Sequence, residues 1–197
     1  MKKFLKLCAY SICIFATGFI CSCNTGNPKV IITTAVGDII IELYINQATI
    51  TALNFLKYVE ENRYEGANFY RVVKKDNQPG NAIKIEVIQG GLFKDNDPNE
   101  LPPIPHETTF QTGILHKNGV VSMARNEPGT ATDDFFICVG DQPELDYGGT
   151  RNPDGQGFAA FGKVIGGMDV VQIIHQSKAK DQYLEPMIRI ISMKLVK

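Results

Sequence analysis

The pattern of hydrophobic positions begins with two β-branched runs, at residues 30–34 and 39–44, which are rich in isoleucine, valine and threonine. A short interruption, Val36-Gly37-Asp38, separates the two runs. Runs of this kind joined by a glycine-containing segment are typical of a β-hairpin. The sequence therefore predicts that the domain opens with two antiparallel strands, with Gly37 and Asp38 in the turn between them.

The hydrophobic period changes to that of a helix between residues 49 and 62. Apolar side chains recur there at steps of three and four residues, at Ala52, Phe55, Leu56 and Val59. The positions between them are mainly polar, so this segment is predicted to form one amphipathic helix. A second helix is predicted at residues 168–175, where apolar side chains again share one face.

Six further segments have the β-branched and aromatic character of strands, and loops rich in Gly, Pro and Asp separate them. They are residues 68–73, 84–89, 120–124, 135–139, 159–164 and 187–196. With the hairpin they make about eight strands. Short strands leave exposed edges unless the sheet closes on itself. We therefore predict a mainly β fold, a closed eight-stranded antiparallel β-barrel capped by two α-helices.

The N-terminal segment differs from the rest of the chain. Lys2, Lys3 and Lys6 precede a run from residue 7 to residue 20 that contains no charged side chain. A basic start followed by an apolar run too short for a comfortable membrane span is typical of an export signal. We predict a signal peptide at residues 1–22; an uncleaved anchor helix is the alternative.

The cysteines are concentrated in this same segment, with only Cys138 in the body. This placement excludes a disulfide framework within the domain, and Cys138 is predicted to be a small core residue. The string Ile20-Cys21-Ser22-Cys23 resembles a lipobox. We predict lipidation of Cys23, a short linker over residues 23–29 and one domain over residues 30–197. The expected location is the bacterial cell envelope, lipid-anchored outside the cytoplasm, and Asn24 is compatible with the periplasmic side of the outer membrane.

Composition narrows the classes of function. The chain is 44% hydrophobic and 21% charged with a net charge of −1, which argues against a disordered chain and against a strongly basic nucleic-acid binder. The three histidines, His106, His116 and His175, lack the spacing of paired metal ligands. The glycine-rich segments match no phosphate-binding motif. We expect neither a metal nor a cofactor.

Five short motifs occur in a fixed order along the body. They are Phe69-Tyr70-Arg71-Val72-Val73, Ile88-Gln89-Gly90-Gly91, Val121-Ser122-Met123-Ala124-Arg125, Phe135-Phe136-Ile137-Cys138 and Phe161-Gly162-Lys163-Val164. In this order they resemble the cyclophilin family of peptidyl-prolyl cis-trans isomerases, and they span nearly all of residues 30–197. The resemblance implies a barrel with a substrate groove along one outer face, and rotation of the peptide bond before proline as the reaction.

The chemistry of that rotation explains which residue types it needs. Rotation costs about 18–20 kcal/mol because the lone pair of the amide nitrogen is delocalised. A donor aimed at this nitrogen and an apolar pocket for the proline ring would favour the twisted state, in which the nitrogen is a better acceptor. By resemblance, Arg71 matches the family's catalytic arginine, and Gln89 matches the glutamine that orients it.

The resemblance assigns six more residues to substrate binding. Phe136 and Leu145 would hold the proline ring, Ala124 and Arg125 would flank the extended peptide, Phe158 stands where a pocket histidine is expected, and Asp134 stands where a second glutamine is expected. Since an acid replaces an amide there, we hypothesise that Asp134 faces Arg71 and forms a charged pair that fixes the guanidinium.

Other positions depart from the family's common pattern. Glu86 and Val87 stand where an aromatic residue and a methionine are expected, and Glu144 replaces a tryptophan. The segment between Arg71 and Gln89 is about ten residues longer than usual, which indicates a surface loop around residues 74–84. These departures remove one apolar wall of the expected proline pocket.

The sequence thus favours a peptidyl-prolyl cis-trans isomerase that acts on X-Pro bonds of exported or envelope proteins and assists their folding. Its expected partners are extended proline-containing polypeptides and, through the lipid, a membrane; we expect a monomer that binds no nucleic acid. One alternative is a catalytically weak proline-peptide-binding or chaperone module with the same fold. Another is a structural envelope lipoprotein with a vestigial groove. Retention of both Arg71 and Gln89 favours the enzyme.

Overall fold

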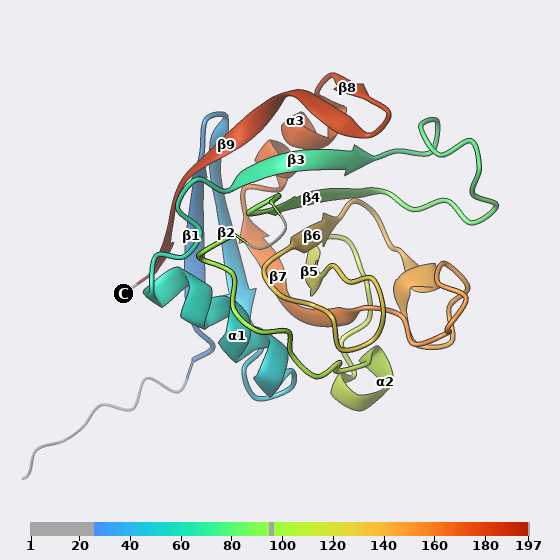
Figure 1. The fold of residues 1–197 in the computed structure, drawn as a ribbon, viewed down its shortest axis with the longest axis horizontal. Helices are drawn as coiled ribbons and strands as arrows, with labels where there is room; N and C mark the ends of the chain where they lie inside the picture. Colours follow the sequence, from blue (N-terminus) through green and yellow to red (C-terminus); the bar gives the residue numbers. More distant parts are fainter. Residues whose placement is uncertain (1–25, 95–96, 197) are drawn as a thin grey trace, which may run out of the picture.

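The computed structural model describes residues 26–94 and 97–196, and within them eight antiparallel strands close into a barrel (Figure 1). The strands are β1 (Lys29–Thr34), β2 (Gly37–Leu43), β3 (Asn68–Val73), β4 (Val87–Gly91), β5 (Val120–Met123), β6 (Phe135–Cys138), β7 (Ala159–Gly166) and β9 (Tyr183–Leu195). Their order is β1-β2-β7-β5-β6-β4-β3-β9, and pairing of β1 with β9 completes the ring. The two-residue strand β8 (Ala179–Lys180) pairs with β9 beside this ring. The predicted closed barrel is confirmed.

Two longer helices cover the barrel where the sequence predicted them. α1 (Thr49–Glu60) packs against β7 and β9, whereas α3 (Met168–Gln176) packs against β2, β3 and β4. Figure 1 shows them on opposite sides of the barrel. The short helix α2 (Thr109–Thr112) and the 3-10 turn η1 (Pro143–Leu145) were not predicted, because elements of three or four residues have no measurable hydrophobic period. No helix in the described ranges has the length and apolarity needed to cross a lipid bilayer.

The predicted position of the first turn is wrong by two residues. Ala35 and Val36 form the turn, while Gly37 already pairs with Thr34 as the first residue of β2. The Thr34 side chain shapes the turn, because its hydroxyl accepts from Val36 N at 3.1 Å and donates to the Gly37 carbonyl at 2.7 Å. A glycine at position 37 allows α3 to pack closely, because a Cβ there would lie 2.7 Å from the Val170 side chain; the φ of Gly37 is 137°.

β4 begins at Val87, three residues later than predicted, because the side chain of Gln78 takes the place of a neighbouring strand. Its amide donates to the carbonyl of Ile85 at 2.8 Å, and Ile85 N donates back at 3.4 Å. The same amide also bonds the carbonyl of Lys74 at 2.7 Å. Gln78 is only 1% exposed, so the loop over residues 74–86 is organised around a buried polar side chain.

The apolar residues form two separate clusters, one on each side of the barrel wall. The barrel interior contains Phe55, whose ring centroid lies 5.3 Å from that of Phe135 and 5.1 Å from that of Phe161. The second cluster is smaller and comprises Val73, Ile85, Val87, Phe136, Cys138 and Leu145, with Ala124 and Phe158 packed against it. Because side chains alternate along a strand, neighbouring Phe135 and Phe136 belong to different clusters. Cys138 is fully buried, as predicted.

Candidate active site

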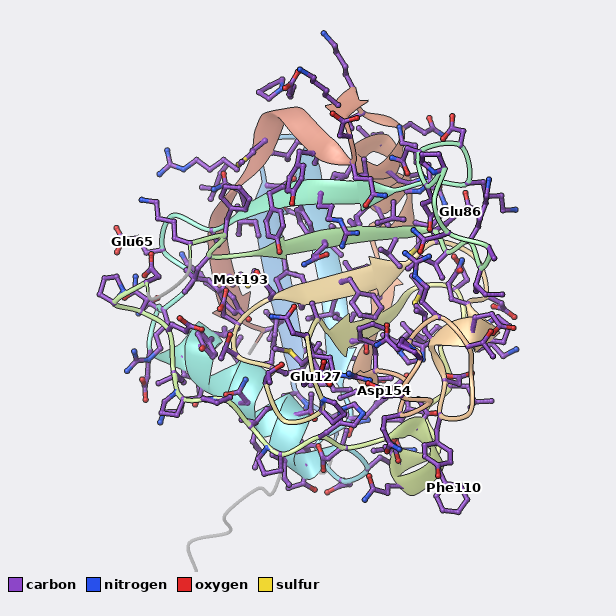
Figure 2. All side chains as sticks on the ribbon, turned by 45° about the vertical axis from the view of Figure 1, so that its right-hand side comes forward. Glu65, Glu86, Phe110, Glu127, Asp154 and Met193 are labelled. Carbon is purple, nitrogen blue, oxygen red and sulfur yellow. The ribbon has the colours of Figure 1, made fainter. Side chains whose placement is uncertain are left out.

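A pocket of about 420 Å³ lies over the second apolar cluster. It is lined by all eight residues that the sequence assigned to catalysis or substrate binding in the body: Arg71, Gln89, Ala124, Arg125, Asp134, Phe136, Leu145 and Phe158. The ninth assigned residue, Cys23, lies outside the described residues. In Figure 2, Glu86 marks the loop that leads into β4 and Asp154 marks the loop between β6 and β7, and both loops are on the side of the barrel turned forward.

Strand register explains why residues distant in sequence meet on this wall. Arg71 on β3 is the direct partner of Gln89 on β4, Gln89 is the partner of Phe136 on β6, and Phe136 is the partner of Ser122 on β5. Side chains that are directly opposite one another in adjacent strands point to the same face of a sheet. The closed barrel therefore places a guanidinium, an amide and an aromatic ring in one row.

Arg71 is held by two glutamines. Its Nη1 donates to Gln89 Oε1 at 2.9 Å, while its Nε and Nη2 donate to Gln182 Oε1 at 3.0 and 2.6 Å. A guanidinium has five N–H groups, so one N–H on Nη1 and one on Nη2 remain beyond these three bonds. The side chain is half-buried and lines the pocket, so it can offer these N–H groups to a ligand there.

The hypothesis of an ion pair between Arg71 and Asp134 is wrong: none joins them in the described part of the chain. Asp134 instead faces Tyr70, and Gln89 Nε2 donates to the Tyr70 hydroxyl at 2.6 Å. Burial raises the pKa of Tyr70, and the hydrogen-bonded Asp134 carboxylate raises it further, which keeps the phenol neutral. Tyr70 and Gln89 thus connect Asp134 to Arg71.

Gln182 is the site residue that sequence reasoning missed most clearly. It lies in the two-residue turn between β8 and β9, where Asp181 and Gln182 both have positive φ, of 50° and 77°. Such turns are usually recognised by Gly or Asn, and neither is present. Its carbonyl also accepts from Val72 N at 2.8 Å, so both its backbone and its side chain attach the turn to β3.

The apolar part of the pocket retains walls despite the departures from the family's pattern. Phe136 and Leu145 are 4% and 0% exposed, and the ring of Phe158 meets Phe136 edge-on with centroids 5.3 Å apart. Ile85 and Val87 supply the side where an aromatic residue and a methionine were expected. Glu86 between them forms an ion pair with Lys75 at 3.3 Å. The result is an apolar slot beside the guanidinium.

A buried histidine supports the floor of this slot. His116 stacks on Phe136 with ring centroids 5.9 Å apart and an angle of 16°. Its Nδ1 lies 2.7 Å from Asp146 Oδ1, and its Nε2 lies 3.0 Å from Ser122 Oγ. Because His116 and Ser122 are 1% and 0% exposed, this Ser-His-Asp row is a packing support, and its hydroxyl is out of reach of a substrate.

Arg125 lines the pocket, but its guanidinium is engaged within the protein. It pairs bidentately with Asp154 at 2.8 and 3.0 Å, donates to the Gly157 carbonyl at 2.9 and 2.6 Å, and lies 5.2 Å from the centre of the Phe158 ring. Only 1% of the Arg125 side chain is exposed. Arg125 therefore fixes Phe158 against the slot, a role that the resemblance did not imply.

The chemistry available in the pocket is that of binding and polarisation. In residues 26–94 and 97–196, no group of three or more His, Cys, Asp or Glu side chains is arranged to hold a metal ion. Cys138 lies in the cluster below the pocket, and burial raises the pKa of its thiol, so it is a poor nucleophile. A positioned guanidinium beside an apolar slot can bind an amide and stabilise charge on its nitrogen without breaking a covalent bond.

Comparison with known proteins agrees with this geometry. The sequence model described as "Cyclophilin type peptidyl-prolyl cis-trans isomerase/CLD" matches residues 29–195. A peptidyl-prolyl cis-trans isomerase of Acinetobacter baylyi is 39% identical over 75% of this chain and 72% of its own, and peptidyl-prolyl cis-trans isomerase A of Dickeya dadantii is 33% identical over 87% and 82%. A crystal structure of a cyclophilin-type isomerase from Cryptosporidium parvum has a TM-score of 0.69 at 21% identity, covering 87% of this chain and 98% of that one.

Proposed function

Because this chain belongs to the cyclophilin family of peptidyl-prolyl cis-trans isomerases, we propose that it rotates X-Pro bonds of exported or envelope proteins while a lipid on Cys23 holds it at a membrane. The observation that carries the catalytic part is the position of Arg71. Three of its five N–H groups donate to two neutral glutamines, and the other two remain available beside an apolar slot.

The proposed mechanism assigns a role to each part of the pocket. The slot of Phe136, Leu145 and Phe158 binds the proline ring, and the Arg71 guanidinium donates to the imide nitrogen as its lone pair becomes available in the twisted state. Since this bond is stronger in the twisted state than in either planar isomer, it lowers the barrier. Each 1.36 kcal/mol of such preference gives about a tenfold increase in rate.

Two further observations support peptide binding in this pocket. The apolar walls Ile85, Val87, Phe136, Leu145 and Phe158 are packed against one another in one cluster, so little ordering is needed when a ligand binds. A solved relative with the same fold was crystallised in the presence of the dipeptide Ala-Pro. We extend this kind of ligand, a proline-containing peptide, to the present chain as part of the proposal.

The envelope location rests on the sequence alone. The basic start, the uncharged run from residue 7 to residue 20 and the lipobox-like string before Cys23 support export and acylation. Only five residues separate Cys23 from β1, so an anchored domain would lie within about 20 Å of the bilayer surface. Its substrates would then be proteins that fold after export.

This location is tested by producing the full chain in a bacterium supplied with a radiolabelled fatty acid. We expect label on the parent chain and recovery with the membrane fraction. Cys23→Ala should lose both, whereas Cys21→Ala, the matched control two residues away, should keep both. Continued acylation of the Cys23→Ala chain, or an unlabelled parent chain that remains in the cytosol, would refute the anchor.

A further inference from the structure

The pocket contains a second guanidinium that neither the resemblance nor the proposed mechanism uses. Arg151, in the loop between β6 and β7, lines the same pocket as Arg71 and donates from Nη1 to the carbonyl of Ile83 at 2.6 Å. Within the described residues, neither Arg71 nor Arg151 forms an ion pair with a carboxylate. Arg125, the third arginine of the pocket, is by contrast neutralised by Asp154.

The backbone of Arg151 is fixed by the turn that carries a wall of the proline slot. Arg151 N donates to the carbonyl of Glu144 at 3.2 Å. The Glu144 carboxylate accepts from both Thr150 N at 2.9 Å and the Thr150 hydroxyl at 2.7 Å. Gly149 packs so closely that a Cβ there would lie 2.5 Å from the Glu144 carbonyl oxygen. Glu144, the residue that replaces the expected tryptophan, thus anchors the Arg151 loop beside Leu145.

The side chain of Arg151 is fixed by the inserted loop over residues 74–86. That loop supplies the carbonyl of Ile83, and it is ordered by buried Gln78 and by a 3.0 Å bond from Gln182 to the carbonyl of Asn77. Figure 1 shows the loops between β3 and β4 and between β6 and β7 projecting from the same side of the barrel. Two departures from the family's pattern, Glu144 and the insertion, therefore both bind Arg151: Glu144 accepts from its backbone N–H and the insertion accepts from its side chain.

Charge is distributed unevenly around the pocket. Burial lowers the pKa of Arg151, and the positive charge of nearby Arg71 lowers it further, so the two guanidinium groups repel each other across the pocket. The acidic side chains that line the pocket, Glu100, Asp133 and Asp134, come from other segments, and Asp133 and Asp134 are engaged by Leu92 N and Tyr70. A carboxylate from a ligand would relieve the repulsion between the arginines.

We propose that Arg151 is a specificity residue that binds the side-chain carboxylate of an Asp or Glu next to the substrate proline. This inference rests on the proposed function, since it concerns the choice of substrate by the same pocket. Adjacent residues of a peptide are about 3.8 Å apart between Cα atoms, so a residue flanking a proline in the slot is within reach of an arginine beside that slot. Arg151 is bonded to Ile83, which precedes β4, whereas Asp133 is bonded to Leu92, which follows β4, so the arginine and the aspartate lie toward opposite ends of this strand. We therefore expect only one of the two flanking positions to favour an acid.

The experiment measures kcat/KM for cis-trans isomerisation of short peptides by the chain from residue 24, which contains every described strand and helix. The peptides carry Glu or Gln directly before or directly after the proline. At one of these positions we expect the Glu peptide to exceed its Gln counterpart by about fivefold, the size of a half-exposed charged contact. This preference should decline as salt is raised from about 50 to about 500 mM, because mobile ions screen it.

Three variants separate a specific contact from a general effect. Arg151→Gln should bring the Glu-to-Gln ratio close to one, and Arg151→Lys should retain part of the preference. Arg189→Gln removes the same charge from β9, away from the pocket, and should leave the ratio at its parent value. An unchanged ratio in Arg151→Gln, or a ratio near one at both positions in an active parent, would overturn the inference while leaving the isomerase function standing. A parent that accelerates none of the peptides would remove both.

Discussion

The electrostatic state of Arg71 depends on the kind of side chain that holds it. Both acceptors, Gln89 and Gln182, are neutral amides, so they orient the guanidinium while leaving its charge for a ligand. A carboxylate in either place would hold the side chain more strongly but would compete with the substrate for its charge. The absence of an Arg71–Asp134 ion pair in the described residues is therefore consistent with a donor kept ready for catalysis.

Gln182 is expected to be a positioning residue for Arg71. Gln182→Ala removes the acceptor of two Arg71 bonds, so kcat should fall about tenfold, equivalent to about 1.4 kcal/mol, with little change in KM. The measurement is a protease-free isomerisation assay, with exposed Gln176→Ala as the matched control. A fall caused only by loss of structure would instead lower the melting temperature and leave the kcat of the folded fraction unchanged.

Asp133 gives an expected pH dependence of stability. Burial raises the pKa of this carboxyl, although hydrogen bonds from Leu92 N and Thr132 lower it in part. The folded chain therefore retains a proton that the unfolded chain has lost, and Asp133 reduces stability as pH rises from about 3.9, the ordinary aspartate value, through the raised pKa.

The measurement is the free energy of unfolding in urea between about pH 4 and pH 7. Asp154 has a lowered pKa and contributes the opposite slope, so the comparison with Asp133→Asn is what isolates Asp133. The Asp133→Asn chain should gain stability relative to the parent as pH rises through this range. A constant difference between the two chains across the range would contradict the assignment.

At the scale of elements, the hydrophobic period located each barrel strand and both longer helices, because burial on one side of the barrel wall leaves a regular pattern in the sequence. The period gave the wrong start for β4, because the Gln78 side chain bonds the backbone of Ile85 in place of a neighbouring strand. It also failed for α2, η1 and β8, which are too short to display a period. Local pattern therefore predicted the barrel but not the short elements and side-chain contacts that order the loops beside the pocket.

The same contrast holds for the candidate site, where residues on strands were predicted and Gln182, in a turn, was missed. Motifs on β3, β4, β5 and β6 placed Arg71, Gln89, Ala124 and Phe136 correctly in one pocket, because strand register aligns them. Gln182 lies 111 residues from Arg71 in sequence, and no local signal connects the two. Contacts made between loops depend on the closed barrel, so they cannot be predicted from residues that are neighbours in sequence.

At the scale of the whole molecule, ring closure is what holds the pocket together. β4 lies between β3 and β6, so the donor and the floor of the slot are separated by one strand in a sheet without free edges among the eight barrel strands. Ile85 from the loop at 74–86 and Arg151 from the loop between β6 and β7 also line the pocket. Figure 1 shows these two loops on the same side of the barrel. Because the reacting residues lie on the barrel wall and other lining residues lie on loops, one reaction can be combined with different substrate preferences.

The central claim is that the Arg71 guanidinium lowers the barrier to rotation in this pocket, and one comparison tests it most directly. Refolding of a protein limited by proline isomerisation is followed with the chain from residue 24, with Arg71→Ala and, as a control for charge, with Arg189→Ala. We predict that the parent and Arg189→Ala accelerate refolding equally and that Arg71→Ala is slower by about 100-fold or more, as for loss of one preorganised donor. Equal acceleration by a folded Arg71→Ala chain would contradict the account.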